Sequence, residues 1–139
     1  MRDARDFQLH PQLAADTFFV TDLPLCRVLL MNDAQYPWLI AVPRIAGLRE
    51  LDELTPTEHG LFGEESRLLQ GALRSLCQPD KLNVAALGNV VPQLHVHHIA
   101  RRTDDAAWPR PVWGVHPAQA YAAAQRDSFL TSLRAALSG

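Results

Sequence analysis

The spacing of hydrophobic residues changes at about residue 55, and that change limits the fold more than any other feature. Before residue 55 the apolar residues fall in short β-branched or aromatic runs that end at Pro, Asn or Asp, as in strands joined by tight turns. The three expected strands are Thr17–Thr21, Leu25–Met31 and Trp38–Val42. Between residue 55 and residue 77 the apolar residues recur at helical spacing. The pattern predicts an α+β fold that begins with an antiparallel meander.

A long helix is expected to begin at Thr55. Thr55 has the side chain of an N-cap, Pro56 suits the first helical position, and Glu58 stands where a capping box needs it. One apolar stripe follows, made of Leu61, Leu68, Leu69, Ala72, Leu73 and Leu76. Its glycines, Gly60, Gly63 and Gly71, either weaken the helix or let another element approach closely. The run Gln78-Pro79-Asp80 ends it.

The remaining elements complete a sheet of about five strands, with one long helix and a C-terminal helix. They are an opening helix or turn at Leu9–Leu13, strands at Leu82–Leu87 and Gln93–Ile99, an ordered loop at Asp104–Gly114 and a helix at His116–Leu137. A chain of 139 residues has the length of one ordinary domain, so we expect a single domain over residues 1–139.

Charge and composition exclude several classes of protein. The chain has 13 Lys plus Arg and 15 Asp plus Glu, a net charge of −2, whereas a protein that coats long nucleic acid needs excess positive charge. A small phosphate ligand needs only a few local donors and is compatible with this balance. The two cysteines form neither a disulfide framework nor a metal-binding pair. With no secretory signal and no apolar run that spans a bilayer, we expect a cytoplasmic protein without a membrane partner.

Three of the six histidines lie within residues 95–98. Alternate residues of a strand share a face, so Gln93, His95 and His97 are expected to point one way and His98 the other. A neutral imidazole can attack phosphorus and form a phospho-histidyl intermediate, while a second imidazole binds phosphoryl oxygens or moves a proton. The amide of Gln93 is expected to hold the ring of His95 in the right tautomer. This chemistry needs no metal or other cofactor.

Other interpretations of the histidines stay open. A His-x-His pair on a strand is a common start of a metal site, although no convincing Asp, Glu or Cys stands nearby to complete one. The histidines also suit a structural role in a core or on a surface. A bulge after Pro92 would place His98, instead of His97, on the active face.

The segment Gln93–Arg101 resembles the signature of the histidine triad (HIT) family, His-φ-His-φ-His-φ-φ. Gln93 matches the first His, His95 the middle His that is the family's nucleophile, and His97 the third; His98 and Ile99 match the hydrophobic pair. The order of the expected elements is also similar to that of the family over about residues 15–115. The resemblance implies a homodimer that binds a small nucleotide substrate.

The resemblance implies a nucleotide hydrolase or nucleotidyl transferase. It would act on the α-phosphate of nucleoside phosphoramidates or dinucleoside polyphosphates through a covalent nucleotidyl-histidine. The alternative is a non-catalytic nucleotide-binding or regulatory module. The resemblance also implies that Asn32 holds the ribose and that Gly88 and Asn89 contact phosphate. All three residues equally suit ordinary turns.

Several residues near the motif are expected to have structural roles. Trp38 is expected in the core, although it lies near a position that carries another His in some HIT proteins. Arg101 and Arg102 are expected to be solvated. The loop with Trp108 and Trp113 either anchors on its own core or reaches toward the partner subunit's site. The remaining histidines, without a chemical partner in the sequence, are His10, His59 and His116.

Overall fold

A three-stranded antiparallel meander forms one side of the sheet, as the sequence predicts. It consists of β1 (Thr17–Asp22), β2 (Cys26–Met31) and β3 (Trp38–Pro43). The computed structural model describes residues 2–138. In it β5 (Val96–Arg101) pairs with β3, and β4 (Lys81–Ala85) forms the edge, so the strand order is β1-β2-β3-β5-β4, antiparallel throughout. The α+β fold is confirmed: five antiparallel strands with three α-helices.

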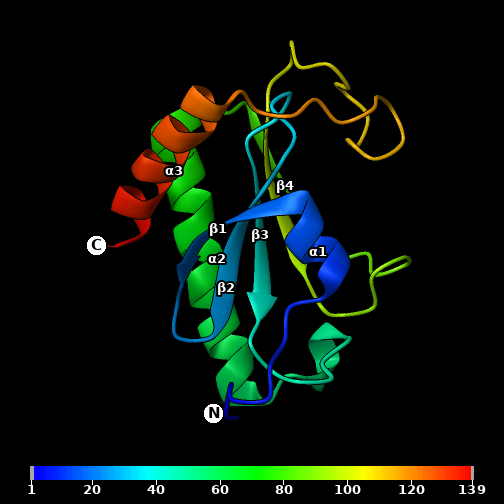
Figure 1. Cartoon of the computed structure of the whole chain (residues 1–139), viewed down its shortest axis with the longest axis vertical. Coiled ribbons are helices and arrows are strands. Elements are labelled where there is room, and N and C mark those ends of the chain that lie inside the picture. The colour runs from blue at the N-terminus through cyan, green and yellow to red at the C-terminus, as the bar shows by residue number, and fades with distance from the viewer. Residues whose placement is uncertain (1, 139) are drawn as a thin grey trace.

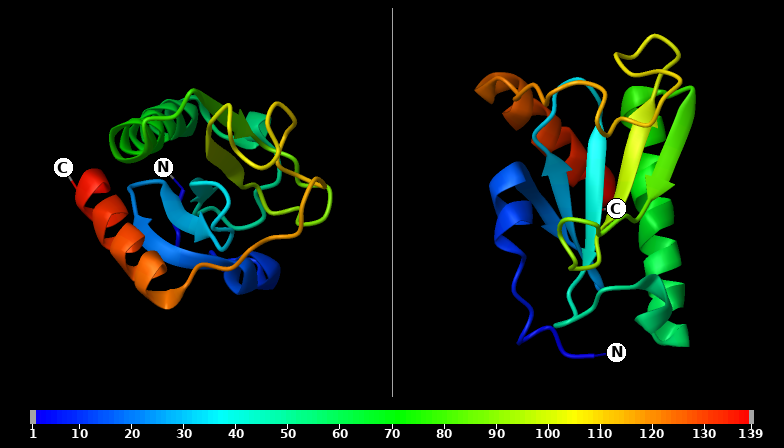
Figure 2. Two further views of the ribbon diagram at one scale, coloured as in Figure 1. Left: turned by 90° about the horizontal axis from the view of Figure 1, so that it is seen from above. Right: turned by 90° about the vertical axis from the view of Figure 1, so that its right-hand side faces the viewer.

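The two faces of the sheet are covered differently. Helices α2 (Pro56–Cys77) and α3 (Ala123–Leu137) lie side by side on one face, over the larger hydrophobic core (Figure 1). The opposite face is covered by α1 (Pro11–Asp16) and by the long loop after β5, over a smaller core (Figure 2). Side chains that alternate along β5 therefore enter two separate environments.

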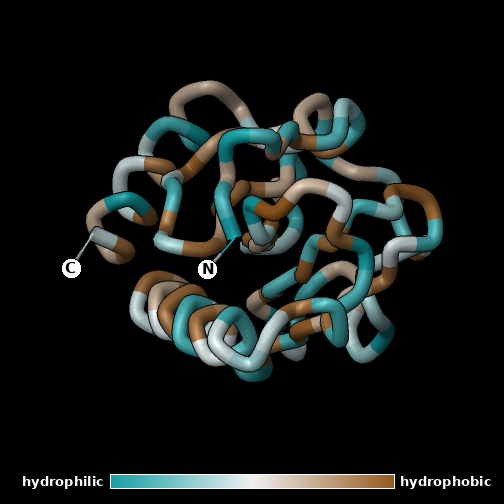
Figure 3. The backbone as a smooth tube through the Cα atoms, turned by 90° about the horizontal axis from the view of Figure 1, so that it is seen from below, coloured by the Kyte–Doolittle hydropathy of each residue, from teal (hydrophilic) through white to brown (hydrophobic). Residues whose placement is uncertain are grey.

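Helix α2 begins as its sequence predicts. Thr55 accepts a hydrogen bond from the backbone N–H of Glu58, and the Glu58 carboxylate accepts one from the backbone N–H of Thr55. Hydrophobic and hydrophilic residues alternate along α2, which is the pattern of a helix with one buried side (Figure 3). The helix ends at Gln78, which adopts the left-handed conformation that stops a helix. Among residues 2–138 no helix has the length and apolar character that crossing a membrane requires.

A buried carboxylate joins α2 to the sheet. Glu65 accepts hydrogen bonds from the backbone N–H groups of Leu25 (2.7 Å) and Cys26 (2.8 Å), where the chain enters β2. Buried N–H groups need such partners, so this contact fixes the position of the helix against the meander.

The first residues of β5 and α3 are displaced furthest from the expected starts of these elements, for identifiable reasons. The fifth strand begins at Val96 and not at Gln93, because Pro92 has no N–H to donate and the N–H of Leu94 bonds to the carbonyl of Leu48 outside the sheet. The C-terminal helix begins at Ala123 and not at His116. The preceding residues bond instead to the turn between β2 and β3, through contacts such as the N–H of Tyr121 to Asn32 Oδ1 (2.9 Å).

Candidate active site

Two of the clustered histidines, His95 and His97, lie together at the start of β5. Their ring centroids are 5.0 Å apart with an interplanar angle of 76°, and both side chains are buried. His97 lies on β5 opposite Ile40 of β3, on the face that α1 covers. His95 precedes the strand. The expected pairing of these two side chains is therefore found, although only one of them is in the sheet.

The proton position on His95 follows from its hydrogen bond. Its Nδ1 lies 2.7 Å from the backbone carbonyl of Gln93. A carbonyl oxygen only accepts, so Nδ1 carries the proton and Nε2 keeps a free lone pair. Nε2 is thereby available to attack an electrophile.

The expected role of the Gln93 amide is wrong. The Gln93 side chain turns to the N-terminal segment, where Oε1 accepts from the N–H of His10 (2.8 Å) and Nε2 donates to the carbonyl of Gln8 (2.9 Å). The backbone of Gln93, and not its side chain, orients His95. The irregular chain after Pro92 explains the difference, because Gln93 is not in the strand that would align the two side chains.

His97 has the opposite tautomer. The indole Nε1–H of Trp38 lies 2.9 Å from Nδ1 of His97, and an indole only donates, so Nδ1 is bare and the proton is on Nε2. Burial, together with smaller contributions from the nearby rings of His95 and His98, lowers the pKa of His97 to about 3. His97 is thus a neutral hydrogen-bond donor at physiological pH.

His98 points to the opposite face, as expected from strand alternation. It is fully buried beneath α2, where Nδ1–H donates to the carbonyl of Val96 (3.0 Å) and Nε2 accepts from the hydroxyl of Ser66 (2.7 Å). Burial lowers its pKa to about 4, although the bond to Val96 acts in the other direction. His98 occupies a position in the hydrophobic core beneath α2. The sheet separates its side chain from those of His95 and His97.

The buried His98 makes stability depend on pH. An unfolded histidine titrates near 6.5 and the folded one near 4, so the unfolded chain binds more protons between these values and stability falls as pH falls. The free energy of unfolding of the wild type should fall between pH 7 and pH 5. In His98→Leu we expect this fall to be smaller by about 2 kcal/mol, because the variant lacks the buried imidazole. Urea unfolding at the two pH values measures this. The exposed His59 offers the control, since His59→Leu should leave the loss unchanged; equal losses in His98→Leu and wild type would contradict the prediction.

Two cavities flank the histidine pair. The larger, about 350 Å³, is enclosed by α1, the end of β2, Trp38 and the loop after β5, and combines the indole of Trp113 with the polar groups of Asn32 and Asp33. The smaller, about 170 Å³, is lined by His95 together with the Arg49–Leu51 turn and the loop after β4. Trp38 and Trp113 both contact the ring of His97, so His97 lies next to the larger cavity.

The expected nucleotide-binding residues divide between these cavities. Asn32 lines the larger one and uses its Oδ1 to hold the chain before α3. Gly88 lines the smaller one beside His95, with a φ of +75° that favours glycine. Asn89 is exposed and lies outside both. The structure thus brings Gly88, but not Asn32 or Asn89, to His95.

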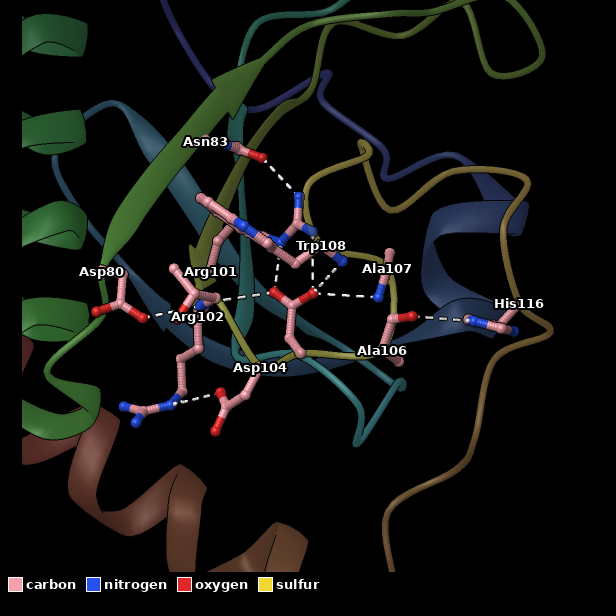
Figure 4. A network of polar contacts seen from close by, with 11 residues as sticks. Asp80, Asn83, Arg101, Arg102, Asp104, Ala106, Ala107, Trp108 and His116 are labelled. Atoms are coloured by element: carbon pink, nitrogen blue, oxygen red, sulfur yellow. Dashed lines mark hydrogen bonds and ion pairs between the residues drawn. The ribbon is translucent and has the colours of Figure 1, made fainter.

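The loop after β5 is held by a buried ion pair (Figure 4). The guanidinium of Arg101 binds both carboxylate oxygens of Asp105 (2.7 and 3.0 Å) and the side chain of Asn83 (2.9 Å). Arg101 is almost completely buried, so the expectation that it is solvated is wrong; Arg102 is exposed, as expected. Burial opposes ionisation of Asp105, but hydrogen bonds from Arg101 and nearby backbone N–H groups outweigh it and lower its pKa.

Within residues 2–138, no three or more His, Cys, Asp or Glu side chains are grouped as ligands for a metal ion.

The model of the HIT domain matches residues 12–104, from α1 to just past β5. The chain belongs to the HIT domain family. No curated protein matches its sequence.

Several solved structures resemble this HIT chain along nearly its whole length. A histidine triad protein from Bradyrhizobium japonicum is 47% identical, with a TM-score of 0.92 over 94% of this chain and 98% of its own. One from Marinobacter aquaeolei is 48% identical, with a TM-score of 0.92 over 95% and 96%. One from Sinorhizobium meliloti is 38% identical, with a TM-score of 0.94 over 97% and 100%.

The sequence reasoning missed two parts of this HIT site. The sequence predicts Trp38 only as a core residue. Its side chain is buried, and its indole also donates a hydrogen bond to His97. The pairing of the strand that carries Trp38 with the histidine strand is the signal that could have indicated this contact. Trp113 packs on His97 and Trp38 of its own chain, so this residue anchors the loop on the chain's own core. It lies beyond the residues that the HIT model matches, and no motif marks it.

Proposed function

We propose that this HIT chain hydrolyses nucleoside phosphoramidates or dinucleoside polyphosphates by nucleotidyl transfer to water. The observation that carries the proposal is the pair of opposite tautomers: His95 with a free Nε2 lone pair and, 5.0 Å away between ring centroids, His97 with an Nε2–H donor. A nucleophile beside a neutral donor is the pair that attack on a phosphoryl group requires.

The reaction proceeds in two displacements. Nε2 of His95 attacks the α-phosphorus, an N–P bond forms, and the bond from phosphorus to the leaving amine or phosphate breaks. The Nε2–H of His97 donates to a non-bridging oxygen of the phosphoryl group, whose negative charge it stabilises. Water then attacks the same phosphorus and loses a proton to solvent, the N–P bond breaks, and the mononucleotide leaves while His95 regains its lone pair.

The two cavities suit the two parts of such a substrate. The larger one offers aromatic rings and polar groups for a nucleoside, with Asn32 near the ribose. The smaller one, with Gly88 and His95, suits phosphate, because glycine lets the backbone approach an anion closely. Asn89 follows Gly88 in the chain but lies outside this cavity, so it has no assigned contact with phosphate in the proposal.

The place of Gln93 in the triad supports an active enzyme. Gln93 stands where the family signature has its first His, and its backbone carbonyl holds His95. Every residue type has that carbonyl, so a Gln at this position leaves the nucleophile oriented.

Mass spectrometry of the protein mixed with a labelled nucleoside phosphoramidate, and separately with a dinucleoside polyphosphate, tests the proposal. We expect a nucleotidyl adduct on His95 and release of the mononucleotide. Tight binding with neither adduct nor release would overturn hydrolysis and leave a nucleotide-binding module.

The partner in this proposal is a second copy of the chain. Strand β4 is an edge strand with unpaired backbone groups, and three exposed apolar residues lie on it or just after it: Val84, Leu87 and Val90. Two such edges are complementary to each other, which gives a two-fold dimer.

Charge placed on this edge is expected to separate the dimer. Val84→Lys should elute in size-exclusion chromatography with light scattering at the mass of one chain, because an ammonium group would be buried between the edges. Phe19→Lys is the matched control, since Phe19 is similarly exposed on the opposite edge strand, β1, and should keep the mass of two chains. A wild type with the mass of one chain would contradict the proposed dimer.

A further inference from the structure

The contact between Trp38 and His97 determines the chemistry available to His97. Both side chains are buried, with relative exposures of 6% and 4%, and the indole Nε1–H donates to Nδ1 over 2.9 Å. Trp38 is held by the pairing of β3 with β5, where it lies opposite Ile99. Two adjacent strands therefore fix both donor and acceptor, and neither depends on a mobile surface group.

A second indole restricts the ring of His97 from another direction. Trp113 lies edge-to-face on His97 with ring centroids 5.0 Å apart, and edge-to-face on Trp38 at 5.8 Å. Trp38 and His97 are themselves 5.6 Å apart. The three rings form a closed contact set, in which a reorientation of the imidazole would require both indoles to move.

Few titratable groups surround the ring of His97. The titratable groups that act on it are His95, at the start of the same segment, and His98, on the same strand but pointing to the other face. The residues paired with His97 on the neighbouring strands are Ile40 of β3 and Ala85 of β4, neither of which titrates.

We infer that Trp38 is a positioning residue: it holds His97 as the neutral Nε2–H tautomer, so that His97 donates a hydrogen bond to the phosphoryl group and does not act as a proton-releasing acid. The phosphoryl end of this inference rests on the proposed function, whereas the tautomer does not. Burial, which lowers the pKa of His97 to about 3, is consistent with a ring that carries no extra proton to release at neutral pH. A leaving group that needs a proton must then receive it from solvent.

The tautomer is tested in the intact, ¹⁵N-labelled protein without any substrate. We expect a correlation across the hydrogen bond between the indole Nε1–H of Trp38 and Nδ1 of His97, with Nε2 of His97 protonated. The correlation should be lost in Trp38→Phe, which keeps a ring but removes the donor. It should persist in Trp113→Phe, which keeps the Trp38 donor. A proton on Nδ1 of His97 in the wild type would overturn the inference, whether or not either variant folds.

Kinetics then test the role. In Trp38→Phe we expect kcat to fall by about 10- to 100-fold, as for other partners that orient a reactive imidazole, while KM changes less than threefold. A folded Trp38→Phe variant with wild-type kcat would overturn the positioning role. If the wild type turns over neither substrate class, the proposed function fails, and the NMR result still decides whether Trp38 fixes the tautomer.

Discussion

His95→Ala should lose at least about 10⁴-fold in kcat while the protein remains folded. The variant removes Nε2 of His95, the one ring nitrogen of His95 and His97 with a free lone pair. The ring of His97 offers no substitute, because its Nδ1 accepts a hydrogen bond from an indole and its Nε2 carries a proton. The structural cost is small, since the His95 ring makes one hydrogen bond, to a backbone carbonyl, which is worth about 1 kcal/mol. Steady-state turnover of a dinucleoside polyphosphate measures the loss, and circular dichroism verifies the fold.

The control for this substitution is His59→Ala, the same change at an exposed position on α2. It should keep wild-type turnover and form the same adduct on His95. Turnover by His95→Ala within tenfold of wild type, or an adduct on a different residue, would remove His95 from the role of nucleophile.

The largest effect on stability is expected from Asp105→Ala, which should lower the free energy of unfolding by about 3–5 kcal/mol. The variant leaves the buried guanidinium of Arg101 without its carboxylate, and an uncompensated buried charge is costly. The same carboxylate also accepts from the N–H groups of Arg102, Ala107 and Trp108, which then lack their partner. Urea unfolding followed by circular dichroism measures the change.

The adjacent residue provides a matched control. Asp104 pairs with Arg102 on the surface, with 77% and 54% of the two side chains exposed, so Asp104→Ala should cost less than about 1 kcal/mol. Equal losses for the two substitutions would show that burial of the ion pair does not determine its contribution.

Most of the fold could be predicted from the sequence because local signals and packing agree. The first three strands are bounded by Pro, Asn and Asp, and α2 has a complete capping box at Thr55 and Glu58, so their positions are correct within two residues. The segment at 116–122 was harder. It is rich in alanine, yet its backbone bonds to the turn at Asn32, and composition does not reveal such a distant partner.

The candidate site could be predicted in part, for the same reason. Strand alternation separates His97 from His98, and the structure agrees. The tautomers depend on a carbonyl and an indole that the strand pairing and the irregular chain at residues 93–95 bring to the rings, which single-sequence patterns do not encode. The buried state of Arg101 depends on Asp105 and on two aromatic rings, those of Tyr36 and Trp108, that lie over its guanidinium.

The position of the Arg101–Asp105 pair has a consequence for engineering and for divergence among relatives. The match to the HIT domain ends at residue 104, and the pair joins the last shared strand to the first turn of the segment beyond it. That segment brings Trp113 to the larger cavity without contributing to the sheet. On the proposed function, a loop transplanted from another HIT protein between residues 105 and 122 would therefore change which nucleoside fits the larger cavity, provided that an acidic residue remains at 105 to pair with Arg101. The larger cavity and the His95–His97 pair are in this sense separable parts of one chain.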